Sequence, residues 1–173
     1  MFRIKTGMKS LLKYISLLAI TGLCFWSCER DDICPASTPT TPFLIVEFFD
    51  NTEPEENLNV QSLGYRIEGS EDIIVIGTTD SIALPLDTNQ NISRIQLISN
   101  AENSNFTNVD TVEFIYQVDE VYVNRACGFK ATFSNLSATR EIETPSTDNW
   151  IRSISVEQIN VENEQNTHVF IFH

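Results

Sequence analysis

Histidine and glycine are scarce in this chain of 173 residues, which has 2 histidines and 6 glycines. His168 and His173 are five residues apart, so on one strand their side chains point to opposite faces and cannot form a site together. No G-x-S-x-G sequence and no glycine-rich phosphate loop occur, which excludes the usual nucleophile elbow and phosphate cradle. We therefore expect a protein that is not an enzyme and that uses no cofactor.

Carboxylates are abundant, but their spacing argues against a glycosidase. Glu55 with Glu56 and Asp119 with Glu120 are adjacent pairs, and adjacent side chains on a strand point to opposite faces. We expect these pairs to lie in turns as solvated charge. A hydrolase of unfamiliar design is the remaining enzymatic alternative, and it would need a concave cluster of acids with perturbed titration.

Basic residues are also scarce, with 11 Lys and Arg against 24 Asp and Glu. Four of the basic residues lie within residues 1–27, which contain no acidic residue. Without residues 1–27 the formal charge is 7 minus 24, or −17. Such a surface repels polyanions, so we expect no nucleic-acid partner and little attraction to an anionic lipid face. Cations, basic proteins and neutral glycans remain as partners.

The uncharged apolar stretch near the amino terminus, Tyr14–Trp26, is too short to span a membrane as a helix. It has thirteen residues, whereas a spanning helix needs about 20 and the apolar region of a secretory signal has roughly 7–15. Basic residues precede the stretch, and the composition changes at Glu29. We therefore predict an export signal over residues 1–27, with a buried core helix or a short anchor as the alternative.

Cysteine is sparse, and the four cysteines are Cys24, Cys28, Cys34 and Cys127. A bacterial lipoprotein signal ends with a small residue directly before the acylated cysteine, and Cys28 follows a serine, whereas Cys24 follows a bulky leucine. If Cys28 carries the lipid, Cys24 leaves with the signal, and the two remaining thiols form one pair in an oxidising envelope. We therefore predict lipidation at Cys28 and a disulfide between Cys34 and Cys127.

A zinc site is the alternative use of the cysteines. Structural zinc takes four ligands, usually as two closely spaced pairs. Cys24 and Cys28 make one marginal pair, while Cys127 and both histidines lie far along the chain. The spacing therefore disfavours a metal.

Two segments carry a resemblance to a known family. CERDDICPASTPTTPFLIVEFFD, Cys28 to Asp50, and NRACGFKATFSNL, Asn124 to Leu136, resemble a family of small Bacteroidota (flavobacterial) lipoproteins known only as a domain of unknown function. The resemblance implies a lipid-anchored envelope domain at the outer membrane, on its periplasmic face or at the cell surface, with no assigned activity. Arg30, Asp31 and Asp32 also resemble the surface-export signal of such bacteria, although a solvated tether is the alternative.

Residues 28–42 read as a polar tether that carries Pro35, Pro39 and Pro42. Such a segment favours extended polyproline geometry, in which fifteen residues would reach roughly 45 Å. A Cys34–Cys127 bond would leave six free residues after Cys28, or roughly 20 Å, and would stabilise the fold by about 4 kcal/mol. We therefore expect the domain to lie close to the membrane.

Residues 43–173 alternate apolar and polar residues with the period of strands, and almost nothing in them reads as helical. Turn formers such as EGSED and DTNQN separate the runs. The expected strands are FLIVEFF, VQSLGYRI, DIIVIG, SIALPL, ISRIQLIS, TVEFIYQV, GFKATFSNL, IRSISVEQINV and HVFIFH. Eight or nine strands without crossover helices predict one antiparallel β-sandwich of immunoglobulin-like or related topology, with a barrel as the alternative.

The patterns of individual strands predict further detail. Pro85 indicates an edge strand or a bulge in SIALPL, and a change of phase before Ile159 indicates a bulge in IRSISVEQINV. In GFKATFSNL, Phe129, Ala131 and Phe133 share one side. Because most aromatic residues alternate along strands in this way, we expect them in the core.

A partial calcium-loop pattern occurs at Asp87, Asn89 and Asn91, which match the first three ligand positions. Ile92 and Ile98 replace the glycine and the glutamate that would complete it. A polar hairpin turn is therefore the alternative.

Three other residues are candidates for binding or modification. Trp150 follows a loop sequence and is a candidate for lining a glycan or peptide groove, with capping of the sandwich as the alternative. Ser81 and Thr111 each lie between an aspartate and an apolar residue, which resembles the O-glycan acceptor of Bacteroidota envelopes.

The features above predict a non-enzymatic, lipid-anchored envelope domain that binds or supports another envelope component. The alternative is a surface lipoprotein that binds a small ligand or a glycan.

Overall fold

A computed structural model describes residues 13, 14, 16, 33–142 and 149–173. Over residues 33–142 and 149–173 the backbone forms strands and turns and no helix. In the described part of the chain, no helix has the length and apolar character needed to cross a bilayer. The chain divides into a small unit, which contains the residues up to Thr38 together with Asn124–Gly128, and a larger unit of Pro39–Val123 with Phe129–His173.

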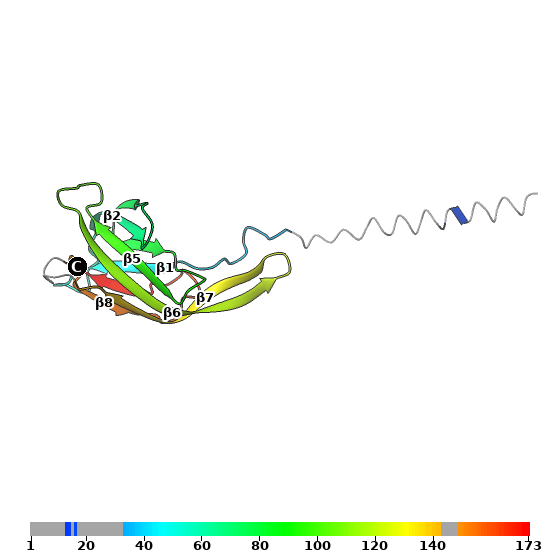
Figure 1. The fold of residues 1–173 in the computed structure, drawn as a ribbon. Coiled ribbons are helices and arrows are strands. Elements are labelled where there is room, and N and C mark those ends of the chain that lie inside the picture. Colours follow the sequence, from blue (N-terminus) through cyan, green and yellow to red (C-terminus); the bar gives the residue numbers. More distant parts are fainter. Residues whose placement is uncertain (1–12, 15, 17–32, 143–148) are drawn as a thin grey trace, which may run out of the picture. The chain divides into compact units, whose positions relative to one another are not determined.

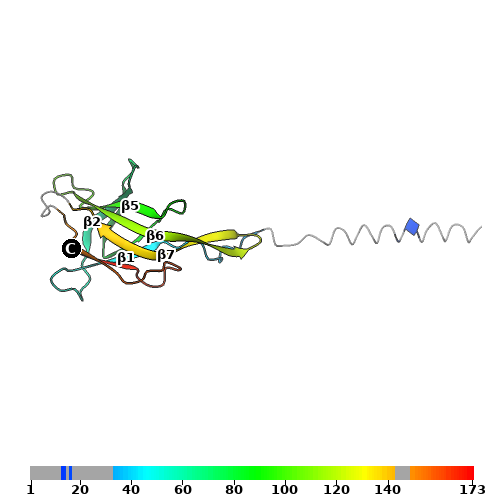
Figure 2. The same ribbon diagram turned by 60° about the horizontal axis from the view of Figure 1, so that its bottom comes forward.

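The described residues form two sheets, of four strands in the order β4-β1-β9-β8 and of five in the order β3-β2-β5-β6-β7 (Figures 1 and 2). The prediction of an all-β sandwich is confirmed. The strands are β1 (Leu44–Phe49), β2 (Val60–Ile67), β3 (Ile74–Thr79), β4 (Ser81–Leu84), β5 (Ile92–Ser99), β6 (Asn108–Asn124), β7 (Gly128–Arg140), β8 (Ser153–Val156) and β9 (Val169–Phe172).

One strand pair departs from the antiparallel prediction. β1 and β9 run parallel, with Val46 opposite Val169 and Phe49 opposite Phe172. In immunoglobulin domains the first strand neighbours the second, whereas here β1 lies between β4 and β9. The topology is therefore a related sandwich and not that of an immunoglobulin domain.

The core forms from the inward side chains of alternating positions. Leu44, Val46 and Phe48 of β1 are fully buried, and so are Val112 and Phe114 of β6. The apolar side chains on the inner face of each sheet are removed from water, so the period-two pattern of a strand determines which of its sides is buried.

The phase change near Ile159 is not the expected bulge. β8 ends at Val156, and the chain then passes to β7, the edge strand of the other sheet. There the Leu136 amide donates to the Ile159 carbonyl at 2.9 Å, and the Val161 amide donates to the Phe133 carbonyl at 2.7 Å. These bonds pair part of the β7 edge. At the edge of the four-stranded sheet, β4 ends just before Pro85, as expected for an edge strand.

β6 and β7 continue beyond the end of β5, as Figure 1 shows. The pairing of β5 with β6 ends at Ile92 opposite Ile115, whereas β6 extends to Asn124. Ala131 and Phe133 are buried as expected, but Phe129 is 64% exposed. The expectation of a core position is therefore wrong for Phe129, because alternation gives the face of a strand and not whether another element covers it.

Candidate functional site

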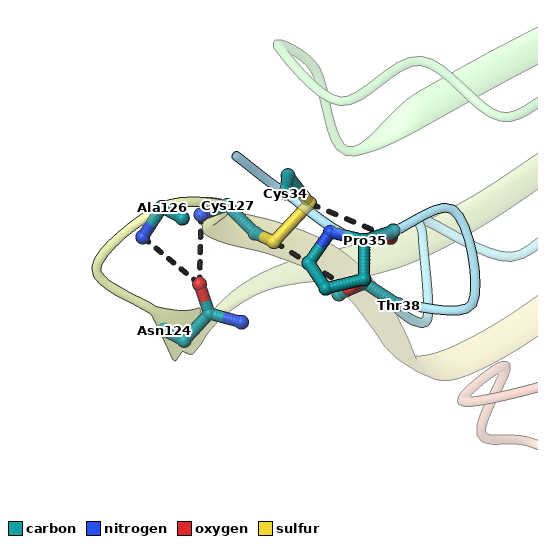
Figure 3. Close-up of a disulfide and its surroundings, with 6 residues drawn as sticks. All are labelled: Cys34, Pro35, Thr38, Asn124, Ala126 and Cys127. Atoms are coloured by element: carbon teal, nitrogen blue, oxygen red, sulfur yellow. Dashed lines mark hydrogen bonds between the residues drawn. A yellow bond between two sulfur atoms is a disulfide. The ribbon is translucent and has the colours of Figure 1, made fainter. Parts of the chain in front are cut away.

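The predicted disulfide between Cys34 and Cys127 is present and lies at the turn between β6 and β7 (Figure 3). Its Cα atoms are 4.9 Å apart, and the two cysteines are separated by 93 positions. Disulfide sulfurs carry no proton, so the Thr38 hydroxyl, 3.5 Å from the Cys127 sulfur, is the donor of that contact. The bond joins the segment before the first strand to the β6–β7 turn.

The sequence of this turn explains why it can hold the cysteine. The Asn124 side-chain oxygen accepts hydrogen bonds from the backbone N–H groups of Ala126 at 2.9 Å and Cys127 at 2.8 Å. Asparagine commonly closes turns in this way. Gly128 follows with φ +72°, a left-handed conformation that glycine adopts without steric cost.

β3 is the edge strand of the five-stranded sheet and carries an exposed apolar run. Ile73, Ile74, Val75 and Ile76 are 47%, 45%, 43% and 49% exposed. Successive side chains on a strand point to opposite faces, so both faces of β3 are open to solvent. In the described residues β2 is its only strand partner, and the other backbone edge is unpaired.

Acidic residues lie on either side of this exposed run. Glu71 and Asp72 precede it and are exposed, and Asp80 follows β3. Apolar exposed edges usually carry lysine or proline as protection against pairing, whereas β3 contains neither. The surface Ile73–Ile76, named here the β3 edge, is therefore an exposed apolar edge that lacks lysine and proline and has acidic ends, and its pairing with β2 contains a register shift beside Ile76.

The β3 edge was missed by sequence reasoning, although a signal was present. DIIVIG has four consecutive apolar residues and does not alternate, which indicates a strand with the same environment on both faces. Such a strand is usually buried on both faces, and only the structure shows that this one is exposed.

An open cavity of about 430 Å³ lies where the end of β2, the loop after β4 and the start of β5 meet. Two lining residues, Asp87 and Ser93, form a closed ring of hydrogen bonds with Tyr116, which is buried behind them. The Asp87 amide donates to the Ser93 hydroxyl at 2.9 Å, and the Tyr116 hydroxyl, 2.6 Å from that of Ser93, donates to the Asp87 carbonyl at 2.9 Å. Burial raises the pKa of Tyr116, so this hydroxyl stays protonated and keeps its donor role.

Arg94 lies at the rim of the same cavity and is held by carboxylates. Its guanidinium lies 2.7 Å from Glu113 and 3.7 Å from Glu68. The Glu113 hydrogen bond and charge raise the pKa of Arg94 above its usual value. The Arg94 guanidinium and the Asp87–Ser93–Tyr116 ring therefore already have partners within the fold.

The partial calcium-loop residues serve a polar turn. The Asp87 carboxylate accepts a hydrogen bond from the Asn89 amide at 2.7 Å, and the Asn91 side-chain oxygen accepts one from the Val118 amide at 3.3 Å. Among the described residues, no group of three or more His, Cys, Asp or Glu side chains is placed to hold a metal ion. Calcium binding at these residues stays a prediction.

Trp150 packs at the end of the sandwich. Its ring centroid is 6.1 Å from that of Phe48 and 5.6 Å from that of His173, and its indole N–H donates to the Leu97 carbonyl at 3.3 Å. This is the capping arrangement, and it commits the polar atom of the side chain to the fold. Glycan contact at Trp150 stays a prediction.

The two predicted O-glycan acceptors are half-buried in strands. Ser81 begins the edge strand β4, and Thr111 lies within β6, which has a strand on each side. Asp110, which precedes Thr111, is fully buried, and its carboxylate accepts from the Asn149 side chain at 2.9 Å and the Ile151 amide at 2.8 Å. Modification at both acceptors stays a prediction.

The residues predicted for lipidation and export lie outside the described part of the chain. They are Cys28, Arg30, Asp31 and Asp32. Their roles stay predictions.

The adjacent acidic pairs and the histidines form no common site among the described residues. Glu55 and Glu56 are exposed in the turn after β1, and Asp119 accepts a hydrogen bond from the Ser134 hydroxyl at 2.6 Å. The His168 ring accepts from the Ile45 amide, whereas a His173 ring nitrogen lies 3.2 Å from the Leu58 carbonyl. The two rings therefore have separate structural partners.

Comparison with known proteins gives one family. The model of a family of unknown function, DUF6452, matches residues 57–173. The ACGFK segment lies within the matched residues, whereas the TPTTP segment precedes them. No curated protein and no solved structure matches the chain.

Proposed function

Because the chain belongs to DUF6452, a family to which no function is assigned, we propose its function from its geometry. The protein is a non-enzymatic domain anchored by a lipid at Cys28 in the outer membrane of a bacterium of the Bacteroidota. It faces the periplasm or the cell surface and needs no cofactor. There it binds an extended segment of another envelope protein along the β3 edge.

The observation that carries this proposal is the exposed β3 edge. An extended peptide that adds to a free sheet edge gains main-chain hydrogen bonds, and its alternate side chains gain apolar contacts. The exposed side chains of Ile74 and Val75 point to opposite faces of β3 and offer such contacts on both, and exposed Ile73 and Ile76 flank them. A single strand added to this edge would therefore remove apolar surface from water on both of its faces.

The charge around β3 restricts the chemistry of the partner. Glu71 and Asp72 lie before the β3 edge and Asp80 lies after it, so a complementary strand is apolar in its middle and carries Lys or Arg near its ends. The formal charge of −17 beyond residue 27, 7 basic minus 24 acidic residues, disfavours a second copy of the same chain. A basic, extended partner segment fits both observations.

The disulfide supports an address outside the cytoplasm, since such bonds persist in oxidising compartments and are rare elsewhere. The predicted export signal and the serine before Cys28 support the lipid anchor.

A recovery experiment from detergent-solubilised envelope tests the binding function. We expect the wild-type chain to recover a stoichiometric partner and a variant with Ile74→Lys and Ile76→Lys to lose it, because the two charges block strand addition. Ile115→Lys is the matched control, since Ile115 is 45% exposed but lies in β6, which has a strand on both sides. The proposal would be contradicted if the β3 variant and the Ile115→Lys control recovered equal amounts of partner. It would also be contradicted if the wild-type chain were recovered without any partner or only as a homodimer.

The open cavity favours a second candidate, a glycan or small-ligand binder. Its volume of about 430 Å³ is within the range of ligand sites, roughly 300–1,000 Å³. Arg94→Ala removes the basic side chain from the residues that line the cavity. We expect unchanged retention on glycan arrays if the partner is a protein strand, whereas a loss of retention would favour the glycan function.

A further inference from the structure

We infer that the part of the β6–β7 ribbon that bears Tyr122 and Phe129 is the membrane-contacting surface of the domain, and that the lipid bilayer interface is its occupant. This inference rests on the proposed anchor at Cys28. It goes beyond that anchor because it assigns a second, protein-mediated contact with the bilayer. It also fixes which end of the β-sandwich faces the lipid.

The two aromatic side chains form an exposed pair. Tyr122 is 59% exposed and Phe129 is 64% exposed, and their ring centroids are 5.3 Å apart with an interplanar angle of 66°. Both residues lie beyond the last β5–β6 pair, Ile92 opposite Ile115, so β5 does not extend beside them. Figure 2 shows that β6 and β7 continue past the end of β5. Aromatic side chains with this exposure are typical of membrane interfaces, where the rings lie at the level of the headgroups.

The covalent path from the anchor to this pair is short. Six residues lead from Cys28 to Cys34, each spanning at most about 3.6 Å, and the disulfide then joins Cα atoms 4.9 Å apart. Phe129 is two residues beyond Cys127. Even when fully extended, this path keeps Phe129 within roughly 35 Å of the acylated residue. Because the limit comes from bond lengths alone, it holds for every arrangement of the tether.

The opposite end of β6 offers a contrast on the same strand. Phe106 is 70% exposed and lies just before β6, in the loop that follows β5. At about 3.3 Å per residue, β6 separates its two ends by roughly 50 Å of strand. Exposure of an aromatic ring alone therefore does not mark the membrane-facing end. The covalent path to the anchor distinguishes Tyr122 and Phe129 from Phe106.

The local charge fits a lipid headgroup. The segment Val121–Lys130 contains Arg125 and Lys130 and no acidic residue, although acidic residues outnumber basic ones by 24 to 11 in the whole chain. Basic residues close to a membrane surface are attracted to lipid phosphates. Asp119 and Glu120 directly precede this segment, so the predicted repulsion between the acidic domain and an anionic surface is smaller over these ten residues than over the whole domain.

Fluorescence of the acylated chain without residues 1–27, in which Trp150 is the tryptophan of the wild type, tests the inference in vesicles. The vesicles contain phosphatidylethanolamine and phosphatidylglycerol, with and without a spin-labelled lipid that quenches tryptophan. Tyr122→Trp reports on the membrane-contacting surface, and Phe106→Trp is the matched control at the other end of β6. For Tyr122→Trp we expect a blue shift of the emission in vesicles and a loss of emission with the quenching lipid. For Phe106→Trp we expect no shift and no loss other than those that the wild type shows through Trp150.

Mass analysis of the same samples separates the two proposals. If the acyl group is present and Tyr122→Trp is quenched no more than Phe106→Trp, the inference is wrong while the proposed anchor stands. If the acyl group is absent, the anchor is wrong, and the inference that rests on it is overturned as well. A blue shift of Tyr122→Trp that follows protein concentration without vesicles would identify a second copy as the occupant, which also overturns the inference.

Discussion

His168 is a buried side chain whose protonation the fold opposes. It is 1% exposed, and its Nδ1 accepts a hydrogen bond from the Ile45 amide at 3.0 Å. Burial lowers the pKa of His168, although the Asn163 backbone hydrogen bond and the charge of Glu164 act in the opposite direction. In the folded chain Nδ1 is therefore the unprotonated nitrogen of the ring.

The lowered pKa of His168 predicts a loss of stability in mild acid. Between the folded pKa and about 6.5 the unfolded chain binds more protons than the folded chain, so the free energy of unfolding falls as the pH falls through this window. We expect urea midpoints to decrease from about pH 7.5 to about pH 5.5 in the wild type. His168→Asn retains an acceptor at the Nδ1 position and should reduce the dependence of the urea midpoint on pH. His173 is present in both proteins, so any difference between them comes from His168. Equal slopes would show that His168 is not the group responsible.

Gly128 predicts a second effect at the scale of one residue. With φ at +72°, any side chain at this position is strained, and alanine should lower the free energy of unfolding by about 1–2 kcal/mol. Gly128→Asn should cost less, because asparagine tolerates the left-handed region. Urea unfolding with the disulfide verified by mass measures both variants, and an alanine variant as stable as the wild type would contradict the argument.

At the scale of elements, the hydrogen-bonded ring of Asp87, Ser93 and Tyr116 attaches the loop after β4 to the sheet. Tyr116→Phe leaves the Asp87 carbonyl without this donor, so we expect a loss of about 1–3 kcal/mol in the free energy of unfolding. Tyr122→Phe is the control, because Tyr122 is exposed and its change should stay within about 0.5 kcal/mol. Equal stabilities of the two variants would mean that the ring contributes nothing.

The sequence predicted the elements better than their pairing. β2 and β5 begin and end where the runs VQSLGYRI and ISRIQLIS do. In β5 the buried face imposes period-two patterning, whereas β2 contains a register shift after Val60 that alternation did not predict. The parallel β1–β9 pair was not predictable, since alternation within a strand does not specify which strand lies beside it. Likewise the sequence placed Phe129 on the side of Ala131 and Phe133 but could not show that the ribbon extends beyond the covered region.

At the scale of the whole molecule, the disulfide closes a loop of 93 positions. Replacement of Cys34 and Cys127 by serine should lower the free energy of unfolding by about 4 kcal/mol, because the unfolded chain regains the entropy of the open loop. Urea unfolding measures this change, and the wild type under reducing conditions should match the double variant. A double variant with wild-type stability would contradict the entropic argument.

Of the candidate sites, the sequence predicted the disulfide but not the exposed surfaces. Cys34 and Cys127 were paired by the count of thiols and by compartment, and that pairing is confirmed. The β3 edge and the exposed Tyr122–Phe129 pair needed the structure, because exposure depends on which distant elements cover a strand. A buried and an exposed apolar run can have the same composition.

The position of the disulfide has a mechanical consequence. A pull on the chain before Cys34 is divided at this residue between residues 35–43, which lead to β1, and the covalent bond into the β6–β7 turn. Once the bond is reduced, the same pull reaches β1 and loads its hydrogen bonds to β4 and β9. Oxidation of two thiols thus reduces the load that would shear the first strand out of its sheet.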